Sequence, residues 1–172
     1  MMHAIVDVVD TPHGPFTMLA DDDGAVLGAG WNTTVDDVVA RVHVQLRPSG
    51  VTAGRVHAAE AVRAYYGGDI AAPGRVQVRQ HGTDLQNAGW QRLRDVAPGQ
   101  TKTYAEFADE LGQDPSAVRA VAAVCARNAV ALFVPCHRVL RADGSLGGFA
   151  WGLEVKRALL AHENAPGFVS LF

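Results

Sequence analysis

Two capping boxes in the second half of the chain constrain its fold more than any other feature. Thr83 with Gln86, and Thr103 with Glu106, have the spacing at which a hydroxyl and a side chain three residues later satisfy the free N–H groups of a helix start. These signals predict one helix over residues 83–96 and a second that begins at Thr103 and stops at Gly112.

A third helix is predicted over residues 115–127. Asp114 is a good N-cap, and Pro115 suits the first helical position because its missing N–H costs nothing there. Only residues 112–114 separate this helix from the preceding one, so a helix-turn-helix is expected. Helix pairs with short turns also occur in proteins that do not touch DNA, and that alternative stays open.

The two faces of this third helix differ in composition. The stripe expected to face the core consists of Val118, Val121, Ala122 and Cys125. The opposite face consists of Arg119, Ala120, Ala123, Ala126 and Arg127. Alanines flanked by arginines allow a close approach to something flat but offer few side chains for reading base edges, which suits a minor-groove contact. Tight helix packing with two solvated arginines explains the same pattern.

The first half of the chain predicts a small sheet with helices. Apolar runs separated by turn signals indicate a β-meander over residues 4–9, 16–20 and 26–31. Helical stretches over residues 35–46 and 55–66 and a short strand over residues 75–79 follow. We therefore expect an α/β (α+β) protein with an N-terminal α/β domain over residues 1–80 and a mostly helical domain over residues 81–172.

Charge and hydropathy narrow the environment and the partners. No run of about 18 apolar residues is present, and the N-terminus lacks the pattern of a signal peptide, so a cytoplasmic protein with no membrane partner is expected. The net charge of −3 argues against a protein that simply coats nucleic acid. Residues 115–142, however, contain four arginines (Arg119, Arg127, Arg138 and Arg141) and no acid. If DNA binds, it should bind there.

Val134-Pro135-Cys136-His137-Arg138-Val139 is the densest cluster of reactive side chains. A thiol becomes a useful nucleophile when neighbouring His and Arg residues favour its thiolate, although a buried structural cysteine is the usual explanation for such a residue. Adjacent residues of an extended strand point to opposite faces. His137 could therefore reach the Cys136 sulfur only through a local turn or a relaying water.

Several motifs together resemble the O6-alkylguanine-DNA alkyltransferases. Pro-Cys-His-Arg-Val is preceded by Arg119-Ala120-Val121 and Asn128, and is followed by a Gly-rich loop and residues 156–163. The resemblance covers residues 82–163, whereas residues 1–80 fit only by the general pattern of a small ribonuclease H-like domain. It implies direct DNA repair by irreversible, single-turnover transfer of an alkyl group from O6-alkylguanine to Cys136. O4-alkylthymine stays an open second substrate.

The resemblance also implies roles for individual residues. Cys136 corresponds to the alkyl acceptor, His137 to the histidine that draws the thiol proton through a water, and Glu163 to the acid that holds this histidine. Tyr104 corresponds to the tyrosine that donates toward the departing guanine. Lys156 lies near the same site, and Asn128 ties the recognition helix to it. Read without the family, Glu163 is a solvated helix-end charge and Asn128 an ordinary C-cap.

The contacts with DNA follow from the same resemblance. Arg119 corresponds to the arginine that fills the stack after the target base is extruded, a step that chemistry on a base within a duplex requires. The implied DNA-binding residues are Arg119, Ala120, Ala123, Arg127 and Thr103. Residues 144–152 are expected to close over the flipped base, after a tight turn at Asp143-Gly144. The implied pocket residues are Val134, Pro135, Arg138, Gly148, Phe149 and Trp151.

Some positions depart from the family pattern. Phe149 stands where tyrosine is common, Ala129 where proline is frequent and Leu85 where phenylalanine is usual. Altered pocket shape or loop stiffness is expected rather than lost activity. Some relatives hold zinc through N-terminal cysteines, but Cys125 is the first cysteine here, and it is expected to be a buried core thiol. No metal or cofactor is therefore expected, and His3, His13, His43 and His57 are read as surface or packing residues.

The expected partner is double-stranded DNA containing alkylated guanine. We expect a monomer and leave self-association along DNA open. Two other classes of protein compete with this interpretation. A binding module that recognises alkylated bases without repairing them would lack the acceptor cysteine, and a helix-turn-helix regulator would need more long polar side chains than Arg119 on its recognition helix.

Overall fold

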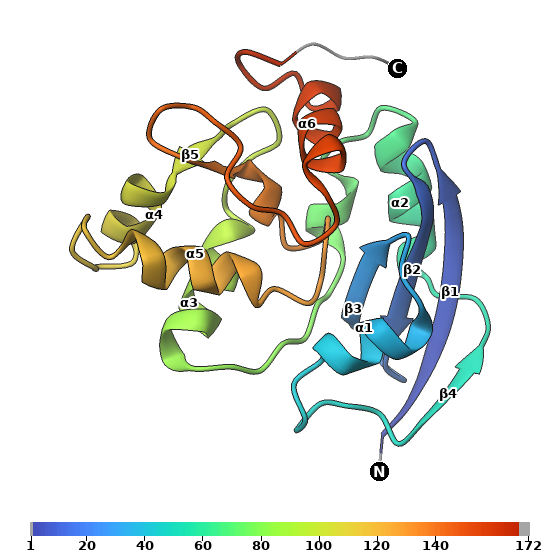
Figure 1. Cartoon of the computed structure of the whole chain (residues 1–172). Coiled ribbons are helices and arrows are strands. Elements are labelled where there is room, and N and C mark those ends of the chain that lie inside the picture. The colour runs from blue at the N-terminus through green and yellow to red at the C-terminus, as the bar shows by residue number, and fades with distance from the viewer. Residues whose placement is uncertain (1, 169–172) are drawn as a thin grey trace. The chain divides into compact units, whose positions relative to one another are not determined.

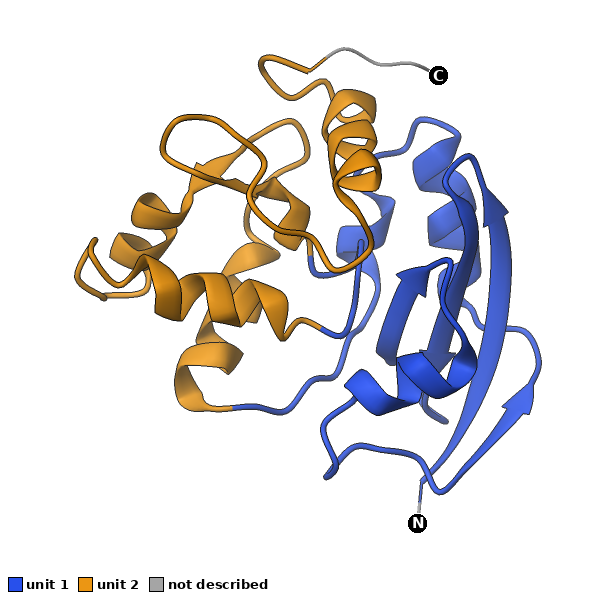
Figure 2. Cartoon of the chain, in the orientation of Figure 1, with its two compact units in different colours: residues 1–82, 129–134 blue, residues 83–128, 135–172 orange. Residues whose placement is uncertain are grey.

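The structure is a computed structural model that describes residues 2–168. The chain divides into two compact units (Figure 2): unit 1 runs to Gly82 and also includes Ala129–Val134, and unit 2 comprises Thr83–Asn128 and the chain from Pro135 onward. The domain boundary at residue 80 stays a prediction. The α+β class is confirmed by a mixed sheet and helices (Figure 1).

Unit 1 is built on a four-stranded sheet in the order β3-β2-β1-β4. The predicted meander is confirmed: β1 (His3–Thr11), β2 (Gly14–Ala20) and β3 (Val26–Trp31) pair antiparallel in sequence order. Every residue of β3 is buried. The fourth strand, β4 (Gly50–Ala53), pairs parallel with β1 and was not predicted, because its four residues carry little periodicity of their own.

The helices of unit 1 are shorter than the sequence indicated. α1 (Val35–Arg41) ends five residues before the predicted end at residue 46, and α2 (Ala58–Tyr66) begins three residues late. The strand predicted over residues 75–79 is wrong. The chain there leaves a short 3-10 helix η1 (Ala72–Arg75) and makes only an isolated bridge between Val78 and Val26. A second bridge joins Val130 to Ala29, so the 129–134 segment also lies along β3.

Unit 2 is mostly helical, and both capping boxes are confirmed. α3 (Asp84–Leu93) and α4 (Tyr104–Glu110) each begin with reciprocal bonds between the capping threonine and the residue three positions later. The Thr103 hydroxyl accepts the Glu106 N–H at 3.1 Å, and the Glu106 carboxylate accepts the Thr103 N–H at 2.9 Å. Short strands β5 (Lys102–Thr103) and β6 (Val139–Leu140) pair in parallel.

The predicted start of the third helix of the domain is wrong. α5 runs over Val118–Ala126, and its N-cap, Ala117, has no side-chain cap. Asp114 instead caps a preceding turn, since its carboxylate accepts the backbone N–H and the hydroxyl of Ser116 at 2.8 and 2.7 Å. The last helix, α6 (Leu153–His162), ends immediately before Glu163. No helix within residues 2–168 is long and apolar enough to cross a bilayer.

A close crossing of α3 and α5 forms the centre of unit 2. A Cβ at Gly89 would lie 2.6 Å from a methyl carbon of Val124, so only glycine lets the helices approach this closely. Trp90 donates its indole N–H to the Val124 carbonyl at 2.9 Å. Val121 and Val124 are the buried residues of α5. Of the predicted core stripe only Val121 is buried, because Val118 is 38% exposed and Ala122 and Cys125 are half-buried.

Gly89→Ala should lower the free energy of unfolding by about 1–2 kcal/mol. Overpacking costs about 1–3 kcal/mol, while the better helix propensity of alanine returns less than about 1 kcal/mol. Urea denaturation measures the change. Gly74→Ala is the matched control, because nothing lies within 4 Å of a Cβ built there. Equal stability of the two variants would contradict the close crossing.

Candidate active site

Cys136 lies in a turn rather than in an extended strand. Residues Cys136–Arg138 form the single 3-10 turn η2, and the Arg138 N–H bonds to the Pro135 carbonyl at 3.1 Å. Because this segment is not an extended strand, Cys136 and His137 are not forced to point to opposite faces. Cys136, His137 and Arg138 are all buried, with 6%, 0% and 6% exposed.

Glu163 binds the two residues that follow Cys136. Its Oε2 accepts hydrogen bonds from His137 Nε2 at 2.8 Å and from Arg138 Nη2 at 3.2 Å. Its Oε1 accepts a hydrogen bond from Arg138 Nε at 2.8 Å. The remaining Arg138 nitrogen donates to the Val96 carbonyl at 2.7 Å. Glu163 is only 2% exposed, so its interpretation as a solvated helix-end charge is wrong.

The electrostatics of this group leave His137 neutral. Burial alone would raise the pKa of the Glu163 carboxyl, but the His137 ring and the Arg138 guanidinium outweigh burial and hold that pKa well below its usual range. Burial lowers the pKa of His137, against the opposing pull of Glu163. Because Glu163 is ionised, it accepts a hydrogen bond, which assigns the His137 proton to Nε2. Nδ1 then carries a lone pair, is buried and has no hydrogen-bond partner among residues 2–168.

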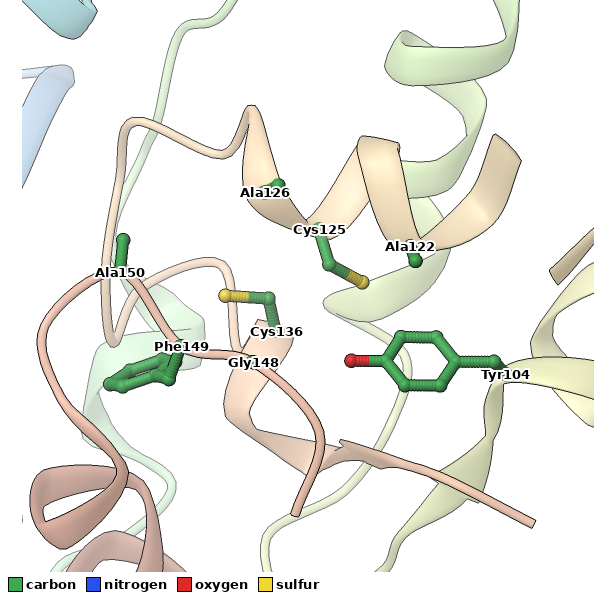
Figure 3. Close-up of a pocket in the computed structure, with 8 residues that line it drawn as sticks. All are labelled: Tyr104, Ala122, Cys125, Ala126, Cys136, Gly148, Phe149 and Ala150. Atoms are coloured by element: carbon green, nitrogen blue, oxygen red, sulfur yellow. The ribbon is translucent and has the colours of Figure 1, made fainter. Parts of the chain in front are cut away.

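A cavity of about 290 Å³ adjoins Cys136. Figure 3 shows its walls: α5 on one side, the loop after residue 147 on another, and the Tyr104 ring with its hydroxyl directed toward the Cys136 segment. Its lining residues are Tyr104, Ala122, Cys125, Ala126, Cys136, Gly148, Phe149 and Ala150. The cavity is mostly apolar with few polar atoms, which is the usual character of a small-molecule site.

Tyr104 is held at the cavity as a hydrogen-bond donor. It is the first residue of α4, directly after the Thr103 cap. Burial, followed by the two nearby thiols, raises its pKa to about 12, so the phenol keeps its proton at neutral pH. A Cβ at Gly147 would lie 3.0 Å from the Tyr104 hydroxyl, and Gly147 has a φ of 71°. Glycine therefore allows the loop to pass close to the tyrosine.

Lys156 secures the loop that forms one wall of the cavity. Its ammonium donates to the carbonyls of Val139 at 2.8 Å and Gly148 at 3.2 Å, and also to the carbonyl of Leu146. The side chain is fully buried, and burial lowers its pKa despite the opposing effect of the two thiols. Three carbonyls match the three protons of the ammonium. Lys156 therefore joins β6 to the loop and does not line the cavity.

The structure brings some predicted pocket residues to the cavity and not others. Gly148 and Phe149 line it. Arg138 does not, because its guanidinium is engaged by Glu163 and Val96. Val134 and Pro135 are buried away from the cavity wall, and Trp151 packs edge-on against Phe149 with ring centroids 5.1 Å apart.

Sequence reasoning missed the wall that α5 supplies. Ala122, Cys125 and Ala126 line the cavity at i, i+3 and i+4 spacing, on the border between the two faces that the sequence distinguished. Cys125 was predicted to be a core thiol; it is half-buried at the cavity instead. Burial and the proximity of Cys136 raise the pKa of its thiol, so it stays protonated.

The predicted DNA-contact face of α5 is exposed. Arg119, Ala120, Ala123 and Arg127 all lie at the surface. Thr103 is half-buried, and its hydroxyl oxygen caps α4. Asn128, directly after the α5 C-cap, is fully buried. The turn expected at Asp143-Gly144 is confirmed, since Gly144 has a φ of 83° and donates to the Arg141 carbonyl at 2.9 Å.

Lys156→Met should destabilise the protein by about 1–3 kcal/mol, because buried carbonyls lose their donor. The amides of the loop from residue 146 to 148 should exchange with solvent faster than in the wild type. Lys102→Met is the control: Lys102 forms a partly exposed ion pair with Glu110 at 2.8 Å, and such pairs contribute at most about 1 kcal/mol. Denaturant unfolding and hydrogen exchange measure both effects. Similar losses of stability in the two variants would contradict the role of Lys156 in holding the loop.

Comparison with known proteins shows which family the chain is similar to. Residues 84–165 match the family model described as 6-O-methylguanine DNA methyltransferase, DNA binding domain. The chain is 36% identical over 166 residues to a methylated-DNA–protein-cysteine methyltransferase of Mycobacterium tuberculosis, covering 95% of this chain and 96% of that protein. The Salmonella typhimurium protein of the same name is 31% identical over 170 residues, covering 95% and 98%.

A solved structure agrees over nearly the whole length. The crystal structure of Mycobacterium tuberculosis OGT in complex with DNA has 30% sequence identity and a TM-score of 0.74, and the match covers 96% of both chains. The chain therefore belongs to the family of methylated-DNA–protein-cysteine methyltransferases.

Proposed function

We propose that this protein repairs alkylated DNA by moving the alkyl group from O6 of a damaged guanine to the sulfur of Cys136. The observation that carries the proposal is a cysteine at a cavity wall, followed in the same turn by a neutral, buried histidine. Its Nδ1 has no hydrogen-bond partner within the described part of the chain. Family membership supports the same chemistry. The presence of Cys136 argues against a module that only binds lesions.

In the proposed reaction a sulfur–carbon bond forms as the carbon–O6 bond breaks. His137 Nδ1 draws the thiol proton through a bridging water, and Glu163 keeps the histidine in the tautomer this requires. The electron pair of the broken bond leaves with the guanine as an anion, toward which the Tyr104 hydroxyl donates a hydrogen bond. The proton taken from the thiol then passes from His137 through water to the guanine, which becomes neutral. The thioether product has no route back to the thiol, so each molecule reacts once.

For duplex DNA we propose minor-groove binding by a helix-turn-helix formed by α4 and α5. The target nucleotide is extruded, since O6 is otherwise hidden in the stack, and Arg119 fills the gap. Exposed alanines on α5 support the close approach. Arg127 and Thr103 are further proposed contacts, and Asn128 ties α5 to the active-site segment. We also propose that unit 1 has a ribonuclease H-like form.

Incubation with a duplex containing O6-methylguanine should add the mass of one methyl group to the intact protein. Peptide mapping should place the adduct on Cys136. Cys136→Ala should gain no mass, while Cys125→Ala, which changes the other thiol at the same cavity, should still be methylated. A protein that binds the lesion without any mass change would be a recognition module instead.

Arg119→Ala should slow repair of duplex DNA about tenfold or more, because unstacking a base costs a few kcal/mol that the arginine offsets. The reaction with free O6-benzylguanine, which needs no extrusion, should change much less. Arg63→Ala, an exposed arginine of α2, is the control for lost charge. Rates with both substrates decide the matter: equal losses for Arg119→Ala would contradict the stacking role.

A further inference from the structure

Arg141 is the one arginine of the 115–142 stretch that the proposed mechanism does not use. It follows β6 directly, and its side chain is exposed. Its backbone helps to close the turn before the loop, because its N–H bonds to the Ser145 carbonyl at 3.0 Å. Its guanidinium makes no hydrogen bond or ion pair with another side chain in the part of the chain that the structure describes.

Arg141 and Arg119 line the same cavity, which is distinct from the one at Cys136. This second cavity has a volume of about 410 Å³, and its walls also include Ala105, Val118, Ala142 and Gly147. Tyr104, Ala122 and Gly148 line both this cavity and the one at Cys136. The two cavities are therefore neighbours. A group in the second cavity sits next to whatever occupies the first.

The chemistry of the second cavity favours an anion. It contains two guanidinium groups and no carboxylate among its lining residues. Asp143 lies outside this lining, and its carboxylate accepts the backbone N–H and the hydroxyl of Ser145 at 2.9 and 2.6 Å. These bonds, and to a smaller extent the charge of Arg141, lower the pKa of the Asp143 carboxyl. Guanidinium groups bind phosphate oxygens through paired, charge-assisted hydrogen bonds.

We propose that Arg141 binds a backbone phosphate of the lesion-bearing strand, immediately next to the extruded nucleotide. The inference rests on the proposed function, because an extruded base in the first cavity brings its own flanking phosphates to the second. Arg119 then enters the base stack while Arg141 neutralises the strand beside it. Arg141 is a binding residue for DNA and takes no part in the chemical step.

The salt dependence of binding tests the phosphate contact directly. Each phosphate that is neutralised adds about 0.9 to the slope of log affinity against log salt. Arg141→Gln, compared with the wild type in a Cys136→Ala background, should therefore bind more weakly with a slope shallower by about one. The ratio of the two affinities should shrink about threefold to fourfold between 50 and 200 mM salt. Arg63→Gln, an exposed arginine of α2 in unit 1, should leave the slope unchanged.

DNA in which one phosphate is replaced by an uncharged group locates the contact. Replacing either phosphate that flanks the O6-methylguanine by a methylphosphonate should weaken wild-type binding at one of the two positions, and Arg141→Gln should lose nothing further there. Arg63→Gln should lose as much as the wild type. Additive losses for Arg141→Gln at both positions would show that its guanidinium contacts neither phosphate.

A merely structural role for Arg141 predicts a different result. If the side chain only supported the turn, Arg141→Gln would lower the thermal midpoint and slow the reaction with free O6-benzylguanine at an unchanged salt slope, and the proposal would be wrong. Methylation of Cys136 in the wild type is scored separately. Methylation with an unaltered slope in Arg141→Gln overturns the Arg141 proposal alone, whereas no methylation overturns the proposed function.

Discussion

The buried carboxylate of Glu163 is the interaction on which the arrangement around Cys136 depends. It binds His137 and Arg138 at once, so both residues after the cysteine are fixed by a single acceptor. Arg138 also reaches the Val96 carbonyl, which attaches the turn to the segment after α3. Removing one partner of such a buried group costs about 3–5 kcal/mol, because the remaining charge is left uncompensated. The orientation of the histidine is thus tied to the stability of unit 2.

Helix α6 supplies the second buried charge of the site, Lys156, and its C-cap residue supplies this carboxylate. Lys156 and Glu163 are seven residues apart, two helical turns, so they extend from the same side of the helix. One holds the cavity loop through backbone carbonyls, and the other holds the turn that contains Cys136. Both charges are fully hydrogen-bonded, which is the condition for burying them. This helix and its C-cap therefore set the positions of both the turn that contains Cys136 and the cavity loop.

Local signals in the sequence were sufficient for part of this fold. The capping boxes at Thr83 and Thr103 and the meander of unit 1 were predictable, because each depends on residues within a few positions of one another. The parallel pairing of β4 and the return of residues 129–134 to β3 depend on partners far along the chain, so no local pattern contained them. Motif order identified the candidate residues of the site. The α5 wall of the cavity was missed because a two-face description of a helix ignores its borders.

The small residues of α5 serve two surfaces at once. Ala122 and Ala126 line the cavity at Cys136, while Ala120 and Ala123 face outward, and Gly89 lets the helix sit close against α3 behind it. Larger side chains on the inner border would fill the cavity, and larger ones outside would hold a flat partner away from the backbone. Helix α5 therefore separates the protein surface from the cavity at the reactive thiol with small side chains on both sides. In the proposed function, the outer alanines let DNA lie close to the helix, while the inner ones leave room for the extruded base beside the sulfur.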